Sequence, residues 1–308
     1  MMHTSGKISR RAALAAGAAL PLVAAAGAGR AAAPMMDAGM SPFMRVKLGG
    51  FDVTTLLAGQ ATRPDPQSIF GMNVDAATFD AVSAQNGIPN TAAQFFFTPT
   101  VVNTGAELVL FDTGLSGAGT VAALQAAGYT ADQVDVVVLT HMHGDHIGGL
   151  MTDGAPTYPN ARYVTGRAEF DGWTGGSNEG FNGMVAPLAD QMTFLEDGGA
   201  VASGLTAMAA FGHTPGHMAY MVESDGQQLV LGADFANHYV WSLAYPDWEV
   251  LFDMDKAAAA ATRRRLLDMM AIDRVPFVGY HMPWPGIGYV ETREDGFRYV
   301  PHSYQLLL

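Results

Sequence analysis

The stretch VVVLTHMHGDHIGGL, residues 136–150, decides the fold. The apolar, β-branched run at 134–139 is typical of a strand buried inside a sheet. The HMHGDH segment that follows, residues 141–146, places three His and one Asp within six positions. A pattern this dense arises by chance on the order of once in a thousand such chains. The sequence therefore predicts a buried strand that ends in a loop of metal-ligand side chains.

This loop indicates more than one metal ion. Four of its side chains are metal-ligand types: His141, His143, Asp145 and His146. Zinc-like ions bind imidazole nitrogen and carboxylate oxygen, and four ligands packed on one loop cannot all reach a single ion. Two ions are therefore the natural interpretation. Because glycine lacks a Cβ atom, Gly144, Gly148 and Gly149 are expected to let the loop turn sharply.

The overall composition is that of a folded, acidic protein. Of the 308 residues, 49% are hydrophobic and 15% are charged, which excludes a disordered chain. The 29 acidic and 16 basic residues give a net charge of -13, which would repel a phosphate backbone, so no nucleic acid is expected as a partner. The chain has no cysteine, which excludes disulfides, thiolate metal sites and cysteine nucleophiles.

Residues 1–33 have the layout of an export signal. Lys7, Arg10 and Arg11 precede an apolar run at 12–29, which Gly and Pro interrupt, so no stable membrane span is expected. The string SRRAAL, residues 9–14, resembles the twin-arginine signal, with a chance Arg pair in an ordinary signal as the alternative. We therefore expect a periplasmic or secreted protein whose residues 34–308 form one domain.

The remaining pattern predicts strands and helices in a layered α/β domain. The expected strands cover residues 43–48, 51–57, 95–102, 108–111, 134–139, 163–165, 205–210, 219–223, 229–231 and 275–279. The expected helices cover residues 76–84, 120–127, 167–173, 184–191 and 255–270. Residues 60–93 are rich in Pro, Asn, Gly and Ala, and we interpret them as a surface excursion that covers a site.

Four further motifs make the chain resemble the metallo-β-lactamase-fold hydrolase superfamily. They are FDTG at 111–114, GHTPGH at 212–217, LGAD at 231–234 and GYH at 279–281. They occur in the order typical of that superfamily, each at or after a predicted strand end. The resemblance implies a four-layer αβ/βα sandwich, in which two mixed sheets pack face to face with helices outside.

The resemblance also implies a binuclear metal centre. It assigns one ion to His141, His143 and His213, and the other to Asp145, His146 and His281, with Asp234 bridging the two. Asp145 and Asp234 are the implied catalytic carboxylates. Asp112 is expected behind the ligands, where it accepts the far N–H of a ligand His. Zinc is the expected metal, and manganese, cobalt and iron are alternatives.

Two such ions predict a hydrolase. They can share a hydroxide by lowering the pKa of water from about 15.7 toward about 7. No protein acid is evident for the departing group, so we expect uncharged esters, lactones or phosphotriesters with good leaving groups. His217 is interpreted as structural, and a part in catalysis stays open for it and for Tyr239.

Within the superfamily, the chain most resembles the secreted methyl-parathion-hydrolase-like enzymes. The match extends from LTHMHGDHIGGL to the tail PWPGIGYVETREDGFRYVPHSY at 283–304. This subgroup implies a small-molecule ester-type substrate, a homodimer and an aromatic-lined mouth. Five aromatic residues either form that mouth or pack loops onto the core: Trp173, Phe181, Trp241, Tyr245 and Trp248.

Three other functions remain as alternatives. One is a glyoxalase-II-like thioesterase, and the chain shows no added basic helical domain to hold glutathione carboxylates. Another is a quorum-quenching-type lactonase, in which a Tyr stands three residues beyond the bridging Asp, where this chain has Asn237. The last is a non-catalytic metal-binding fold.

Overall fold

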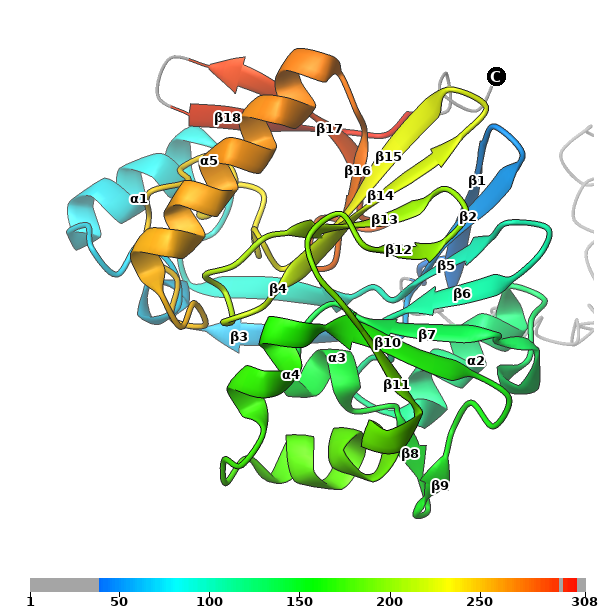
Figure 1. Cartoon of the computed structure of the whole chain (residues 1–308). Coiled ribbons are helices and arrows are strands. Elements are labelled where there is room, and N and C mark those ends of the chain that lie inside the picture. Colours follow the sequence, from blue (N-terminus) through cyan, green and yellow to red (C-terminus); the bar gives the residue numbers. More distant parts are fainter. Residues whose placement is uncertain (1–38, 294–295, 304–308) are drawn as a thin grey trace, which may run out of the picture. The chain divides into compact units, whose positions relative to one another are not determined.

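Two mixed seven-stranded sheets carry the fold (Figure 1). The computed structural model describes residues 39–293 and 296–303, so the export signal predicted at 1–33 lies outside the described residues. In spatial order, the first sheet contains β1 (Phe43–Leu48), β2 (Phe51–Leu56), β5 (Thr100–Asn103), β6 (Leu108–Phe111), β7 (Val136–Leu139), β10 (Arg162–Gly166) and β11 (Met192–Leu195). The second contains β12 (Ala200–Ala202), β13 (Leu205–Ala209), β14 (Met218–Ser224), β15 (Gln227–Ala233), β16 (Phe277–Gly279), β17 (Ile287–Arg293) and β18 (Gly296–Pro301).

Smaller elements connect and cover these sheets. Two antiparallel strand pairs stand apart from them, β3 (Gly59–Pro64) with β4 (Ala92–Phe97) and the hairpin of β8 (Met151–Thr152) with β9 (Ala155–Pro156). The α-helices are α1 (Ala76–Gln85), α2 (Gly117–Ala126), α3 (Gly144–Ile147), α4 (Arg167–Trp173) and α5 (Lys256–Asp273). Short 3₁₀ turns lie at Pro66–Ser68, Ala131–Gln133 and Ala186–Gln191, and a π-helical turn lies at Phe181–Val185.

The main core lies between the two sheets. Strand β6 contributes to this core and to a second apolar layer, because its side chains point alternately to the two faces of the sheet. Val109 and Phe111 pack toward the second sheet, against residues such as Tyr220. Leu108 and Leu110 pack outward, against the helices on the other face. A strand buried on both faces reads as a continuous apolar run, which is the pattern that the sequence shows here.

Helices cover the outer face of each sheet, which confirms the expected four-layer architecture. Leu124 of α2 and Leu188 of the 3₁₀ turn close the outer face of the first sheet. Leu266 and Met270 of α5 close the outer face of the second. Figure 1 shows α5, in orange, lying across β17 and β18. Among the described residues, no helix is long and apolar enough to cross a membrane.

Some expected elements differ from the structure. The predicted strand at 95–102 is two strands, because the chain turns at Pro99 and passes from the β3–β4 pair into the first sheet. The predicted helix at 184–191 is a π-helical turn followed by a 3₁₀ turn, with a proline near the start of the latter. The sequence did not predict β3, because its side chains are mostly exposed and it lacks an apolar alternation.

Candidate metal centre

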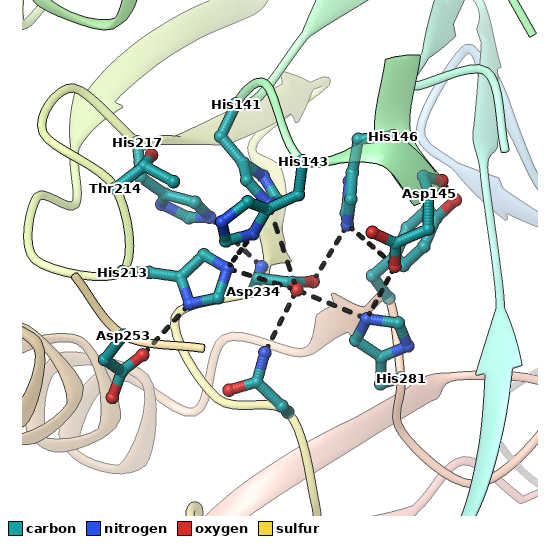
Figure 2. A network of polar contacts seen from close by, with 12 residues as sticks. His141, His143, Asp145, His146, His213, Thr214, His217, Asp234, Asp253 and His281 are labelled. Atoms are coloured by element: carbon teal, nitrogen blue, oxygen red, sulfur yellow. Dashed lines mark hydrogen bonds and ion pairs between the residues drawn. The ribbon is translucent and has the colours of Figure 1, made fainter. Parts of the chain in front are cut away.

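The candidate ligands follow strand ends that meet at one edge of the fold. In the first sheet β6, β7 and β10 are parallel, so Asp112 and the HMHGDH loop emerge on the same side. In the second sheet β13 and β15 are both antiparallel to β14, and β16 is parallel to β15. The chain reaches His213 after β13, Asp234 after β15 and His281 after β16. Figure 2 shows these three side chains converging on the HMHGDH side chains.

Three imidazoles form the first ligand group. The Nδ1 atom of His143 lies 3.1 Å from Nε2 of His141 and 2.9 Å from Nε2 of His213. On the far side of each outer ring, His141 Nδ1 lies 3.1 Å from the Thr140 hydroxyl and His213 Nδ1 lies 3.0 Å from the Asp253 carboxylate. Because His141 and His213 donate Nδ1–H to these outer partners, their Nε2 lone pairs both face His143 in the middle of the group. Facing lone pairs repel one another, so a cation between them would stabilise the group.

Asp145, His146, Asp234 and His281 form the second group. The Nε2 atom of His281 lies 3.3 Å from the Asp145 carboxylate and 3.2 Å from Asp234, and His146 Nε2 lies 3.3 Å from Asp234. Asp234 also lies 3.4 Å from His213 Nε2 in the first group. Its carboxylate therefore stands between the two groups, in the position that a bridging ligand needs.

Buried atoms without a partner show that the residues fit cations. Among the described residues, His146 Nε2 and Asp234 Oδ1 are enclosed by protein, and although they lie 3.3 Å apart, neither atom makes a hydrogen bond. Leaving such atoms unpaired is costly, and native proteins rarely do so. The ligand atoms within each group lie within 4.8 Å of one another, which is close enough to surround one ion per group.

The charges in the site also favour cations. Burial and the neighbouring His213 together lower the pKa of His143 to about 4, so this imidazole is neutral and its lone pair is free. Burial would also lower the pKa of His281, but the charge of Asp234 outweighs it and raises that pKa to about 10. The buried carboxylates thus attract positive charge, which divalent ions would supply in place of protons.

Asp112 lies behind the second group, as the resemblance implies. Its Oδ2 atom lies 2.8 Å from His146 Nδ1, and the same carboxylate accepts hydrogen bonds from the Thr140 amide and hydroxyl. Its backbone has a φ of 61°, a left-handed conformation that is uncommon for a residue other than glycine. The fold holds this strained conformation because it directs the carboxylate toward His146 and Thr140.

Glu169 is a supporting residue that the sequence analysis missed. Its buried carboxylate accepts hydrogen bonds from the Met142 amide, the Gly216 amide, the Thr214 hydroxyl and the Trp173 indole. It therefore ties the HMHGDH loop to the loop that carries His213. A Cβ atom on Gly216 would lie 2.0 Å from the Glu169 backbone nitrogen, so only glycine permits this approach. Glu169 lies in no motif that would have singled it out.

Asn237 and Tyr280 also support the site. The Asn237 amide donates to Asp234 Oδ2 at 3.0 Å, and so helps to orient the carboxylate between the two groups. The Tyr280 hydroxyl donates to the Asp145 carbonyl oxygen at 2.6 Å, and its ring packs on His146 with centroids 3.9 Å apart. Tyr280 lies within the GYH motif, and that position was the one available signal for it.

The remaining candidate residues have structural contacts. The His217 Nε2 atom accepts the Asp234 amide at 3.1 Å, which supports a structural role. Tyr239 packs on His238 at 4.8 Å between ring centroids. Gly148 and Gly149 each lie where a Cβ would overlap backbone oxygens, whereas Gly144 faces open space and is not required there for steric reasons.

A cavity of about 370 Å³ opens over the metal-ligand residues. Its floor contains His143, Asp145, Asp234 and His281. Its walls contain Phe95, Phe97, Leu115, Phe252 and Arg63. The rings of Phe95 and Phe97 meet the His281 ring edge-on at 5.4 and 5.5 Å, so β4 holds the apolar wall against a ligand.

The five aromatic residues proposed for the cavity mouth do not line this cavity. Phe181, Trp241 and Trp248 are buried in outer clusters, where large side chains fill space between loops and sheets. Tyr245 stacks on Trp248 at 4.9 Å. Trp173 lies 5.9 Å from the His143 ring and donates to Glu169, so it packs behind a ligand. The expectation of a mouth built from these residues is therefore corrected.

Solved structures share this architecture. AidC, a dizinc quorum-quenching lactonase crystallised with N-hexanoyl-L-homoserine, is 26% identical, and the match covers 86% of this chain and 98% of AidC with a TM-score of 0.79. AbOPH, a hydrolase of the β-lactamase superfamily, is 22% identical with a TM-score of 0.80, covering 87% and 99% of the two chains, and this likeness concerns the fold alone.

Curated relatives match a smaller part of the chain. The probable metallo-hydrolase YflN of Bacillus subtilis is 27% identical over 51% of this chain, and the uncharacterized protein YobT of the same organism is 26% identical over 46%. The chain spans 66% of the length of each of these relatives. The sequence model of the metallo-beta-lactamase superfamily matches residues 98–281, the segment from the turn before β5 to the last candidate ligand. This chain therefore belongs to the metallo-beta-lactamase superfamily.

Proposed function

We propose that this protein is a binuclear metal-dependent hydrolase that cleaves esters and lactones. The single observation that carries the proposal is the position of Asp234, between two complete ligand groups on the floor of an open cavity. A binding fold without catalysis has no need to open both groups to a cavity. We assign His141, His143 and His213 to one ion, Asp145, His146 and His281 to the other, and Asp234 to both.

Two divalent ions, zinc in our proposal, would supply Lewis acidity to the bond under attack and lower the pKa of water. The protein supplies orientation and a proton acceptor. Asp145 lines the cavity, and although burial raises the pKa of its carboxyl, the His146 charge and the His281 hydrogen bond lower it to about 2. This carboxylate is therefore ionised at neutral pH, and while Oδ2 faces the other ligands of the second group, its remaining oxygen can accept a proton and pass it to the departing oxygen.

The cavity wall supports a substrate with an apolar body and an oxygen-bearing end. Phe95, Phe97 and Phe252 present ring surface, and Arg63 of β3 is the cationic group among the lining residues. The likeness to AidC favours lactones among these substrates. Phosphotriesters are the second candidate, since the motifs around 139–150 and 283–304 resemble the methyl-parathion-hydrolase-like subgroup.

A substrate panel tests this function. The metal-loaded protein should turn over dihydrocoumarin, an N-acyl homoserine lactone and p-nitrophenyl acetate, and methyl paraoxon tests the second candidate. A glutathione thioester represents the thioesterase alternative. Turnover of the thioester alone would refute the proposal, and turnover of none by protein that contains metal would support the non-catalytic alternative.

The ligand assignment predicts the metal content of variants. Asp145→Ala should reduce the metal content to about one ion and the hydrolysis rate by orders of magnitude, because the second group loses a ligand while the first stays complete. Elemental analysis and circular dichroism would measure metal content and folding. Asp171→Ala, which replaces an exposed Asp of α4, is the control and should keep both ions. A full complement of metal in Asp145→Ala would contradict the two-group assignment.

We also propose export through the twin-arginine route, on the basis of the SRRAAL string at 9–14. Replacing Arg10 and Arg11 with Lys should retain the precursor in the cytoplasm, because that route recognises the arginine pair. Cell fractionation with immunoblotting measures the distribution. Unchanged export of the double variant would favour an ordinary secretory signal. A homodimer remains part of the proposal, and sedimentation velocity tests it.

A further inference from the structure

A second cavity, of about 220 Å³, lies beside the start of β4. Phe95 and Phe97 of this strand line the first cavity, whereas Phe96, which points to the opposite face, lines the second. The other large side chains around it are Ile88, Tyr239, Trp241 and Pro283. His281 lines both cavities, so the second one reaches the back of the metal centre.

His238 supplies a hydrogen-bond donor to this cavity. Its side chain is 93% buried, since the residue is only 7% exposed. The Nδ1 atom accepts hydrogen bonds from the amides of Val240 and Trp241, both at 3.1 Å, so in the neutral ring the proton is on Nε2. Burial lowers the pKa of His238 to about 3, so the ring is neutral at physiological pH.

The Nε2–H group of His238 has no hydrogen-bond partner in the part of the chain that the structure describes. The two hydrogen bonds of the ring both go to Nδ1, and none from a described residue goes to Nε2. The Nε2 atom is also not fully enclosed by protein. Because His238 lines the cavity, this Nε2–H group is the donor that its ring can offer to a ligand there. The ring is held there by stacking on Trp241, with centroids 4.1 Å apart and planes 17° apart.

We propose that this cavity binds an uncharged, mainly apolar small molecule that carries one hydrogen-bond acceptor, which the His238 Nε2–H group recognises. No Asp, Glu, Lys or Arg lines the cavity among the described residues, and both ring nitrogens of His281 already face Phe96 or the ligand carboxylates, so a charged ligand would lose its hydration without an ion-pair partner. The aromatic rings of Phe96 and Trp241 would cover the apolar part of the ligand. This binding does not depend on the hydrolase activity proposed above.

Cyclohexanone is a suitable probe, because it has an apolar ring, one carbonyl acceptor and no bond that a hydrolase cleaves. For a ligand of about seven non-hydrogen atoms we expect saturable binding with a Kd on the order of 1 mM. Isothermal titration calorimetry measures binding. Tryptophan fluorescence should change on titration, and Trp241→Phe should remove that change, because Trp241 lines the cavity. Cyclohexylammonium, the same ring with a positive charge, should not bind.

Two variants locate the binding. His238→Phe keeps a stacked ring and removes the donor, so it should weaken cyclohexanone binding about tenfold. Ala92→Leu fills the cavity from β4 and leaves the turn at 238–241 intact, so it decides the question even where His238→Phe does not fold. Ala200→Leu, on an exposed position of β12, is the matched control and should bind normally. Equal binding of cyclohexylammonium, an unchanged Kd in Ala92→Leu, or no saturable binding to the native protein would each overturn the proposal.

Discussion

At the scale of single residues, the metal centre depends on side chains that touch the ligands from behind. Asp253 is 2% exposed and lies between His213 Nδ1 at 3.0 Å and the buried guanidinium of Arg263 at 2.7 Å. Arg263 also donates to the carbonyl oxygens of Pro246 and Trp248. This network orients the His213 ring. It also holds the backbone of residues 246–253 in place.

Asp253→Asn tests that role. The amide oxygen can still accept from His213, but the negative charge is lost and Arg263 loses its ion-pair partner. We expect metal affinity at the first ligand group to fall by about 10-fold to 100-fold, the usual effect of changing such a supporting residue. Competition with a chromogenic chelator measures the affinity.

The control for this variant is Asp255→Asn, two residues further along. Asp255 caps α5 by accepting the Ala258 amide at 2.9 Å, and Asn caps helices equally well. This control should bind metal as the native protein does. Equal affinities in the two variants would show that Asp253 does not orient His213.

At the scale of elements, α5 stabilises the outer face of the second sheet. Its apolar side chains Leu266, Leu267 and Met270 are fully buried, and Asp255 begins the helix. Gly212, at the start of the loop that carries His213, lies so close to α5 that a Cβ would be 2.2 Å from the Ala259 nitrogen. The helix therefore supports both the sheet and a ligand loop.

Leu266→Ala should destabilise the protein by about 2–5 kcal/mol, because it removes buried methyl groups and leaves a cavity. Urea unfolding followed by circular dichroism measures this free energy. Ile272→Ala, on the same helix, is the matched control, since Ile272 is 76% exposed and its replacement should change stability by at most about 0.5 kcal/mol. Similar losses in both variants would mean that α5 does not pack through its Leu266 face.

At the scale of the whole molecule, the ligand groups join the two sheets. His141, His143, Asp145 and His146 follow β7 of the first sheet, whereas His213, Asp234 and His281 follow strands of the second. Each proposed ion would therefore bind residues from both sheets. Metal binding should stabilise the contact between the sheets, because only the folded chain brings the ligands together.

Removing the metal should therefore lower the melting temperature. At a free metal concentration of about 1,000 times Kd, binding stabilises the folded state by about 4 kcal/mol, which corresponds to roughly 10 °C for a domain of this size. Differential scanning calorimetry with and without a chelator measures the shift, and His146→Ala should show a smaller one. Identical melting temperatures after verified metal removal would contradict the coupling.

The sequence by itself determined the local features of this protein. The apolar run before His141 predicts a buried strand because its side chains must face two apolar layers, and the dense His and Asp pattern predicts metal ligands because of their chemistry. The resemblance of the further motifs to the metallo-β-lactamase superfamily implied the ligand groups and Asp112. Within each motif, the residues that carry the signal lie close together in the chain.

The tertiary structure alone decided which distant residues meet. Glu169 binds the Met142 amide from 27 positions away, Asp253 reaches His213 across 40, and Phe96 accepts from His281 across 185. Glutamate, aspartate and phenylalanine are too common for any local pattern to reveal such partners. The cavity wall depends on β3, which was not predicted because it lacks an apolar alternation, and on β4, whose end was predicted only as part of one longer strand with β5. Contacts of this kind follow from how the sheets and their connections pack, since packing depends on the whole chain at once.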